Sequence, residues 1–132
     1  MNARRNTLDE PVPAPPPTIL VVEDDVLVRH IASAYLRDSG FNVIEATGAD
    51  EAIRVLKSEV HVDIVFSDVN MPGSMDGFGL AQWVRRERPR LQVILTSGGP
   101  RTAKEATEQG PILAKPYDHA ALERYFRALL EP

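Results

Sequence analysis

Short apolar runs alternate along this chain with longer segments in which apolar residues recur every three or four positions. The runs are rich in β-branched residues and end in polar or turn-forming residues, which is typical of buried strands. The longer segments have the periodicity of amphipathic helices. The predicted strands cover residues 19–22, 41–46, 62–67, 91–95 and 111–114, and the predicted helices cover residues 27–39, 49–56, 78–88, 100–109 and 122–130.

Each predicted strand is followed by a predicted helix, five times in succession. Strict alternation with short connections is typical of a parallel sheet with helices on both faces and right-handed crossovers. We therefore predict an α/β fold, a flavodoxin-like (βα)5 doubly wound architecture with a five-stranded parallel sheet. The strand order 2-1-3-4-5 is favoured because it places the first and third strands, which both end in carboxylates, side by side.

The helices differ in the strength of their patterns. Leu27, Ile31, Ala34 and Tyr35 recur at helical spacing in the first one, and Gly40 suits its C-terminal end. The segment 100–109 is short and mostly polar, so its helix is the weakest prediction.

A chain of 132 residues is long enough for one domain, and 43% hydrophobic residues are enough for a sizeable core. Residues 1–17 are predicted to be a disordered or polyproline-like tail, because proline fills much of its end and cannot join a helix interior or a sheet. The predicted domain covers residues 18–131.

The charge and composition exclude several classes of function. A net charge of -4 argues against a nucleic-acid-binding surface, which usually carries a basic patch. The absence of cysteine excludes disulfides and thiolate metal sites. No apolar run reaches the ~18 residues of a membrane span, and no secretory signal is present. We therefore expect a cytoplasmic protein without direct nucleic-acid contact or membrane insertion.

Three carboxylates stand at the ends of the two strands that the predicted order makes neighbours. Glu23 and Asp24 directly follow the first strand, and Asp68 directly follows the third. Carboxylates packed together repel one another unless a cation compensates, and oxygen ligands without nearby His or Cys indicate Mg²⁺. Mg²⁺ often binds phosphate as well, so a phosphoryl group is the predicted cargo. The alternative reading as a helix cap suits Asp25 and leaves the other two acidic residues unexplained.

Two further strand ends complete the predicted site. Thr96 offers a hydroxyl and Lys115 an ammonium group to phosphoryl oxygens. Together with Mg²⁺, these groups would offset the charge of a phosphoryl group on Asp68 in the transition state and in the product. Asp68 is therefore the predicted nucleophile, which forms an aspartyl phosphate. Pro116 follows Lys115, and the sequence leaves open whether their peptide bond is cis.

Five motifs now make the sequence resemble the receiver domain of two-component response regulators over residues 18–130. The motifs are I-L-V-V-E-D-D at 19–25, D-V-N-M-P at 68–72, M-D-G at 75–77, L-T-S at 95–97 and K-P-Y at 115–117. The resemblance implies that Asp68 is the phosphoacceptor, with Thr96 as the switch hydroxyl and Lys115 as the family's lysine. The implied metal ligands are Glu23, Asp24, Asp68 and the backbone carbonyl of Asn70, with Asp24 favoured over Glu23 as a direct ligand.

The resemblance also implies a function and a partner. A phosphohistidine on a sensor histidine kinase or a histidine phosphotransfer protein would donate the phosphoryl group to Asp68, and the resulting change of conformation would alter the binding of an output protein. Such a domain is a switch rather than an enzyme. Because the sequence stops soon after the last predicted helix, we expect a stand-alone receiver or one excised from a longer protein; a phosphate relay or sink without its own output is the alternative.

Three features depart from the family pattern. Ile112 stands three positions before Lys115, where the family usually has an aromatic switch residue. The segment 96–115 is shorter than usual, so the output face beside helix 100–109 is expected to be remodelled. The loop 71–77 has one residue more than the common form, and Gly73 makes that insertion easy.

Two other classes of function remain to be weighed. A binding module of the same fold that no longer uses phosphate is disfavoured by the complete set of acidic, hydroxyl and lysine residues. A phosphatase of the haloacid dehalogenase class also uses a nucleophilic aspartate after a strand, but it needs a second acidic residue two positions later. Here that position is Asn70, which cannot act as acid or base.

Overall fold

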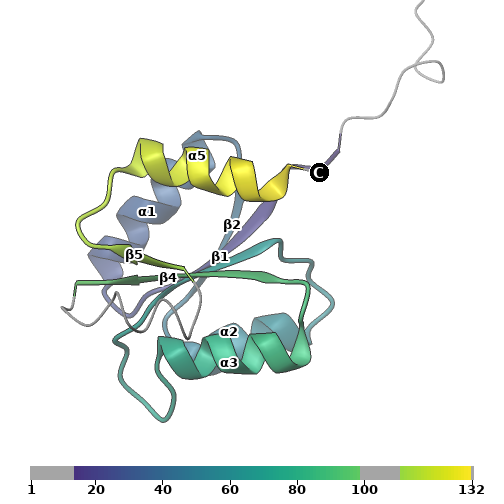
Figure 1. Ribbon diagram of the computed structural model, residues 1–132, viewed down its shortest axis with the longest axis vertical. Helices are drawn as coiled ribbons and strands as arrows, with labels where there is room; N and C mark the ends of the chain where they lie inside the picture. Colours follow the sequence, from purple (N-terminus) through teal and green to yellow (C-terminus); the bar gives the residue numbers. More distant parts are fainter. Residues whose placement is uncertain (1–13, 99–110, 132) are drawn as a thin grey trace, which may run out of the picture.

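The computed structural model describes residues 14–98 and 111–131 and contains one sheet with helices on both faces (Figure 1). Five parallel strands form the sheet in the order β2-β1-β3-β4-β5. The strands are β1 (Thr18–Val22), β2 (Asn42–Ala46), β3 (Ile64–Asp68), β4 (Gln92–Ser97) and β5 (Ile112–Ala114). The helices are α1 (Val26–Asp38), α2 (Ala49–Lys57), α3 (Gly77–Glu87) and α5 (His119–Leu130). The predicted fold class and strand order are confirmed.

Two predicted segments cannot be compared in full with the structure. The predicted helix at residues 100–109 lies outside the described residues, and so do residues 1–13 of the predicted tail. Residues 14–17 of that tail have no regular secondary structure. Within the described part of the chain, no helix is both long enough and apolar enough to cross a bilayer.

The apolar runs of the sequence are buried because helices cover both faces of the sheet (Figure 1). Side chains from one face, including Leu20 and Val65, pack with Leu80 and Val84 of α3 and with the apolar side of α2. Side chains from the other face of β1, β3 and β4 pack around Leu36 of α1 and around Leu122 and Phe126 of α5. The acidic strand ends are therefore anchored by a core on each side.

Short-range capping explains where the helices begin and end. Asp25 precedes α1, and its side chain accepts a hydrogen bond of 3.0 Å from the backbone N–H of Val28, as the capping alternative predicted. Asp76 and Asp118 cap α3 and α5 in the same manner. Gly40 follows the end of α1 with φ +98°, a conformation that glycine adopts without strain.

Strand β3 differs from its prediction at both ends. It begins at Ile64 rather than at residue 62, because Asp63 is used to bind the start of β1: its N–H donates to the carbonyl of Thr18 at 2.9 Å, and its carboxylate accepts from the Thr18 N–H at 2.8 Å. At the other end, β3 includes Asp68, which pairs with Thr96 of β4. The backbone of Asp68 is therefore held inside the sheet instead of in the loop that follows.

Candidate functional site

Glu23, Asp24 and Asp68 come together at the carboxyl edge of the sheet, as the predicted strand order requires. The strands that precede them are neighbours, with Val22 of β1 paired to Ser67 of β3. One carboxylate oxygen from each of the three acidic residues lies within 4.8 Å of the other two. Glu23 and Asp68 are buried, whereas Asp24 is exposed. The acidic cluster is therefore accessible from the side of Asp24.

Lys115 reaches this acidic cluster from the far edge of the sheet. Its Nζ lies 3.2 Å from Asp68 Oδ1 and 3.4 Å from Glu23 Oε1. Burial alone would lower the pKa of Lys115, but the charges of Asp68 and Glu23 outweigh it and raise the pKa above its ordinary value. Lys115 is therefore a fixed positive charge at the carboxylate of Asp68. Its peptide bond to Pro116 is cis, which answers the question that the sequence left open.

Glu23 shows that one lysine does not fully compensate the acidic cluster. Burial raises the pKa of Glu23 above its ordinary value. The N–H of Asp25, which donates to Glu23 Oε2 at 3.0 Å, opposes this rise, while the charge of Asp68 adds to it. The net direction remains upward despite Lys115. A further cation at this position would stabilise the ionised form of the acidic cluster.

The acidic cluster fits a hard divalent cation by size and by donor type. Two oxygens bound to one Mg²⁺ lie at most ~4.2 Å apart, because Mg²⁺–oxygen distances are about 2.0–2.1 Å. The 4.8 Å span of Glu23, Asp24 and Asp68 is close to this limit, and a water-mediated contact from one of them accommodates the difference. Asn70 follows Asp68 by two residues and has an exposed side chain; the role of its carbonyl as a ligand stays a prediction.

Thr96 presents an unused hydroxyl next to the phosphoacceptor candidate. It is the direct Cα partner of Asp68 across β3 and β4, and it is 3% exposed. Its Oγ1 is buried and has no hydrogen-bond partner among the residues that the structure describes. Leaving a buried hydroxyl unpaired costs about 1–3 kcal/mol, so this group calls for an explanation, and a partner that binds in another state of the protein supplies one.

Gly77 shows why the M-D-G motif ends in glycine. The N–H of Gly77 donates to the carbonyl of Val69 at 2.8 Å, so α3 begins directly against the end of β3. A Cβ atom at position 77 would lie 2.2 Å from the Asp68 carbonyl oxygen and 2.7 Å from Val69 Cα. Only glycine permits this close approach of α3 to β3. The M-D-G motif contains the glycine, but the sequence alone does not explain why it is needed.

Tyr117 is a neighbour of the site to which the sequence assigned no role. Its ring makes an edge contact with Phe66, with the centroids 5.6 Å apart. Burial, and then the charges of Glu23 and Asp68, raise the pKa of Tyr117 to about 12. The only sequence signal for it was its place in K-P-Y, two residues after Lys115.

Helix α1 exposes apolar side chains beside the acidic cluster. Val26, Leu27 and Ile31 are 68%, 65% and 47% exposed, so the side of the helix that Leu27 and Ile31 share by their spacing faces away from the core. The buried residues of α1 are instead Ala32, Ser33 and Leu36. A groove of about 400 Å³ adjoins this face and is lined by Val28, Ile31, Lys115, Pro116, Tyr117 and His119.

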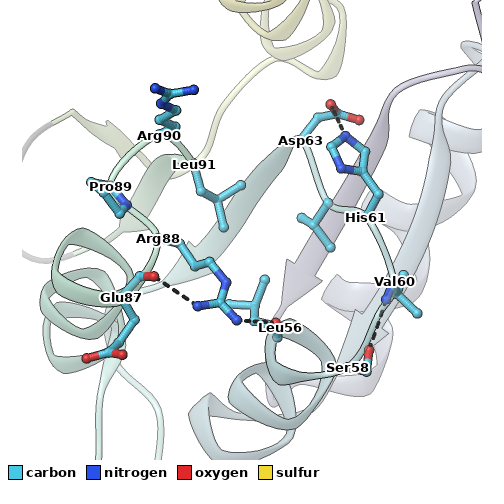
Figure 2. A pocket seen from close by; sticks show the side chains of 11 residues that line it. Leu56, Ser58, Val60, His61, Asp63, Glu87, Arg88, Pro89, Arg90 and Leu91 are labelled. Atoms are coloured by element: carbon cyan, nitrogen blue, oxygen red, sulfur yellow. Dashed lines mark hydrogen bonds and ion pairs between the residues drawn. The ribbon is translucent and has the colours of Figure 1, made fainter.

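A second cavity, of about 580 Å³, lies at the opposite edge of the sheet (Figure 2). Several of its polar groups already have partners. His61 Nε2 lies 2.8 Å from Asp63 Oδ1, and the guanidinium of Arg88 donates to the carbonyls of Glu87 and Leu56 (Figure 2). The first contact lies within the loop before β3, and the Arg88 contacts connect the end of α3 with α2.

Comparison with known proteins agrees with the geometry of the carboxyl edge. Residues 19–127 match the family described as response regulator receiver domain. The response regulator protein FleR of Pseudomonas aeruginosa is 39% identical over 108 residues, which are 79% of this chain and 22% of FleR. The autoinducer 1 sensor kinase/phosphatase LuxN of Vibrio harveyi is 34% identical over 82 residues, which are 62% of this chain and 9% of LuxN.

A solved structure shows the same fold. The response regulator receiver protein from Sinorhizobium medicae WSM419 superposes with a TM-score of 0.79 at 29% sequence identity, and the superposition covers 87% of this chain and 94% of that one. The chain spans less than a quarter of FleR and of LuxN, so these matches concern the domain and not the whole of those proteins. The chain belongs to the receiver-domain family of the response regulators in two-component signalling.

Proposed function

We propose that the chain is a phosphorylation switch in which Asp68 accepts a phosphoryl group from a phosphohistidine. In this step a carboxylate oxygen of Asp68 attacks phosphorus, the phosphorus–nitrogen bond breaks, and the imidazole leaves with its electron pair. The observation that carries the proposal is the buried Oγ1 of Thr96, which has no hydrogen-bond partner in the described part of the chain, on the residue that pairs with Asp68 across β3 and β4. A phosphoryl oxygen on Asp68 supplies the acceptor that this hydroxyl lacks.

The surrounding residues support this chemistry by their charge. Lys115 Nζ lies 3.2 Å from Asp68 Oδ1 and can donate a hydrogen bond to one phosphoryl oxygen, while the hydroxyl of Thr96 donates to another. Glu23 and Asp24, with Asp68 and the carbonyl of Asn70, are the proposed ligands of Mg²⁺. When bound, Mg²⁺ neutralises charge on the carboxylates and on the phosphoryl oxygens. These residues bind and orient the group, which supports the proposed role of the domain as a switch.

The exposed apolar face of α1 supports a protein as the phosphoryl donor. Val26, Leu27 and Ile31 lie on the helix that directly follows Glu23 and Asp24, and the adjoining groove includes Lys115. A donor that packs on this face comes close to Asp68. We therefore propose that the face binds an apolar helical surface next to the phosphohistidine of a sensor histidine kinase or a phosphotransfer protein.

The proposed domain covers residues 18–131, and residues 1–17 are the proposed tail. The family match over residues 19–127 lies inside this domain and supports the division. FleR is a response regulator and LuxN a sensor kinase/phosphatase, so segments similar to this chain occur in both kinds of protein.

Phosphoryl transfer from a small donor tests the proposed function directly. Incubation with acetyl phosphate and Mg²⁺ is expected to add one phosphoryl group to the intact chain, detected by mass spectrometry. Removing Mg²⁺ with a chelator is expected to suppress the gain in mass, and peptide mapping is expected to place it at Asp68. A chain that gains no mass under these conditions would be a binding module of the receiver fold rather than a phosphorylation switch.

Mg²⁺ is expected to stabilise the domain against unfolding. A cation that binds only the folded state at about 100 times its dissociation constant adds about 2.7 kcal/mol to the free energy of unfolding. Urea titrations with and without Mg²⁺ measure this increment. Asp24→Asn should reduce it strongly, whereas Asp50→Asn, which changes an exposed carboxylate at the start of α2, should leave it intact. Equal increments in the two variants would place the cation elsewhere.

Thr96→Val is expected to separate the two states of the switch. Valine removes a buried hydroxyl without a partner among the described residues, so the free energy of unfolding of the unphosphorylated protein should stay equal or rise by about 1 kcal/mol. The phosphorylated fraction at steady state with acetyl phosphate should fall several-fold, because a phosphoryl oxygen loses its donor. The exposed Thr47 provides the control variant Thr47→Val. A large loss of stability in unphosphorylated Thr96→Val would contradict this account.

A further inference from the structure

Tyr117 lies between the phosphorylation site and the groove beside α1. It lines a small cavity of about 10 Å³ together with Thr96, Glu23 and Phe66. A space of this size holds about one water at most, so it allows a small movement of a side chain but not the binding of a ligand. Tyr117 also lines the larger groove, with Val28 and Ile31 of α1. One side chain thus borders both the buried site and the surface.

Ring contacts continue from Tyr117 in two directions. On the inner side, its ring meets Phe66, which precedes Asp68 by two residues on β3. On the outer side, its ring meets His119 edge to face with the centroids 5.4 Å apart, and His119 stacks on Tyr35 of α1 at 5.2 Å. Packed rings transmit small displacements because the gaps between them are too small to absorb movement.

Ile112, at the position of the family's aromatic switch residue, does not point toward Thr96. The strand register pairs Leu95 with Ile112 and Thr96 with Leu113. Because side chains alternate along a strand, Ile112 lies on the face of Leu95 and packs with the group that includes Ala81. Phe66 and Tyr117 both share the small cavity with Thr96, and of these two rings it is Tyr117 that also lines the larger groove.

We propose that Tyr117 couples phosphorylation of Asp68 to the shape of the groove lined by Val28, Ile31 and His119. This inference rests on the proposed function. A phosphoryl group attracts the Thr96 hydroxyl on one side of the small cavity and the ammonium of Lys115, which precedes Tyr117 by two residues. Both movements reach the Tyr117 ring, and the ring passes them to His119. The groove, which adjoins the face of α1 proposed to bind the phosphoryl donor, therefore has a different shape before and after phosphoryl transfer.

The three tyrosines of the chain provide a test that needs no variant. Ring signals of ¹³C-labelled tyrosine are recorded by NMR with Mg²⁺ alone and after addition of beryllofluoride, a stable mimic of the phosphoryl group. The Tyr117 signal is expected to shift most and the Tyr35 signal less. The Tyr125 signal should shift several-fold less than that of Tyr117. An unchanged Tyr117 signal at full occupancy of beryllofluoride would overturn the proposal.

Variants distinguish coupling from mere packing. In Tyr117→Leu the signals of the Ile31 methyl and the His119 ring should lose most of their beryllofluoride-induced shift, while bound fluoride remains visible by ¹⁹F NMR. Tyr117→Phe keeps the ring and should restore the shift. Ile112→Val should behave like the wild type. Wild-type shifts at Ile31 and His119 in Tyr117→Leu would contradict the proposal.

The outcomes also separate this inference from the function on which it rests. If the wild type binds no beryllofluoride and gains no mass from acetyl phosphate, the proposed function fails and the coupling fails with it. If the wild type binds beryllofluoride at Asp68 and the groove signals respond independently of Tyr117, only the coupling fails.

Discussion

Asp68→Asn is expected to abolish the gain in mass that acetyl phosphate and Mg²⁺ produce in the wild type. An amide is not a competent nucleophile toward phosphorus, and the other acidic residues of the site, Glu23 and Asp24, follow β1, whereas Asp68 is the residue paired with Thr96. The loss should therefore be complete rather than partial. Intact-protein mass spectrometry over a series of acetyl phosphate concentrations measures it.

The same variant is expected to remain folded, which makes the loss interpretable. Asparagine removes one negative charge from the acidic cluster, and the charge of Asp68 is one of the causes that raise the pKa of Glu23. The variant should consequently unfold at the same or at a higher urea concentration, and it should gain less stability from Mg²⁺. Asp50→Asn is the matched control and should be phosphorylated normally. A gain in mass that persists in Asp68→Asn would show that another residue accepts the phosphoryl group.

Gly77→Ala is expected to cause a loss of stability of about 3 kcal/mol or more. Alanine in a helix is intrinsically favoured over glycine by about 1 kcal/mol, so helix propensity alone predicts the opposite sign. The new Cβ would lie 2.2 Å from the carbonyl oxygen of Asp68, and backbone atoms cannot move aside as a flexible side chain can. Overpacking usually lowers the free energy of unfolding by about 1–3 kcal/mol. We expect a loss at the upper end of this range or above it, because the new Cβ would collide with backbone atoms.

This variant should also impair phosphorylation, because relief of the contact moves either α3 or the end of β3 that holds Asp68. Urea unfolding and the rate of phosphoryl uptake measure the two effects together. Gly48→Ala is the control, since a Cβ at Gly48 meets no atom within 4 Å, and it should lose less than about 1 kcal/mol. Similar stabilities for the two variants would mean that the backbone relaxes around position 77 at little cost.

The positions of Glu23, Asp68 and Lys115 could be predicted because a parallel sheet converts strand order into proximity. Each of these residues ends or follows an apolar run, and the carboxyl ends of parallel strands meet at one edge. The continuous apolar runs also identified the strands correctly, since both sheet faces are covered. The pattern of apolar runs therefore predicted which charged groups come together at this edge, and the structure brings them together there.

The exposed side of α1 could not be predicted from spacing alone. Leu27 and Ile31 lie four residues apart and therefore share one side of the helix. Leu36 follows Leu27 by nine residues, or two and a half turns, so it lies on the opposite side, and that side packs in the core. Periodicity shows which residues share a side of a helix but not which side packs on the sheet.

The roles of Tyr117 and Gly77 were also beyond the sequence, for a different reason. Each depends on a contact between segments joined only by the three-dimensional structure: a ring beside Phe66 and Thr96, and a helix start against Asp68. A sequence also cannot show that the Thr96 hydroxyl lacks a hydrogen-bond partner among residues 14–98 and 111–131, because this depends on which side chains reach it in three dimensions. The output face near residues 100–109 lies outside the described structure, so its expected remodelling stays a prediction.

The start of β1 has a practical consequence for how this domain is handled in experiments. Residues 16 and 17 are held at the amino edge of the sheet, where Asn42 donates its side-chain amide to the Pro16 carbonyl and its N–H to the Pro17 carbonyl. Asp68 stands at the end of a parallel strand, at the opposite edge. A surface linker, dye or affinity tag attached through the N-terminal segment therefore enters the domain at the edge remote from the phosphoacceptor. Immobilised in this way, the protein can present its reactive edge to a soluble donor in a binding sensor.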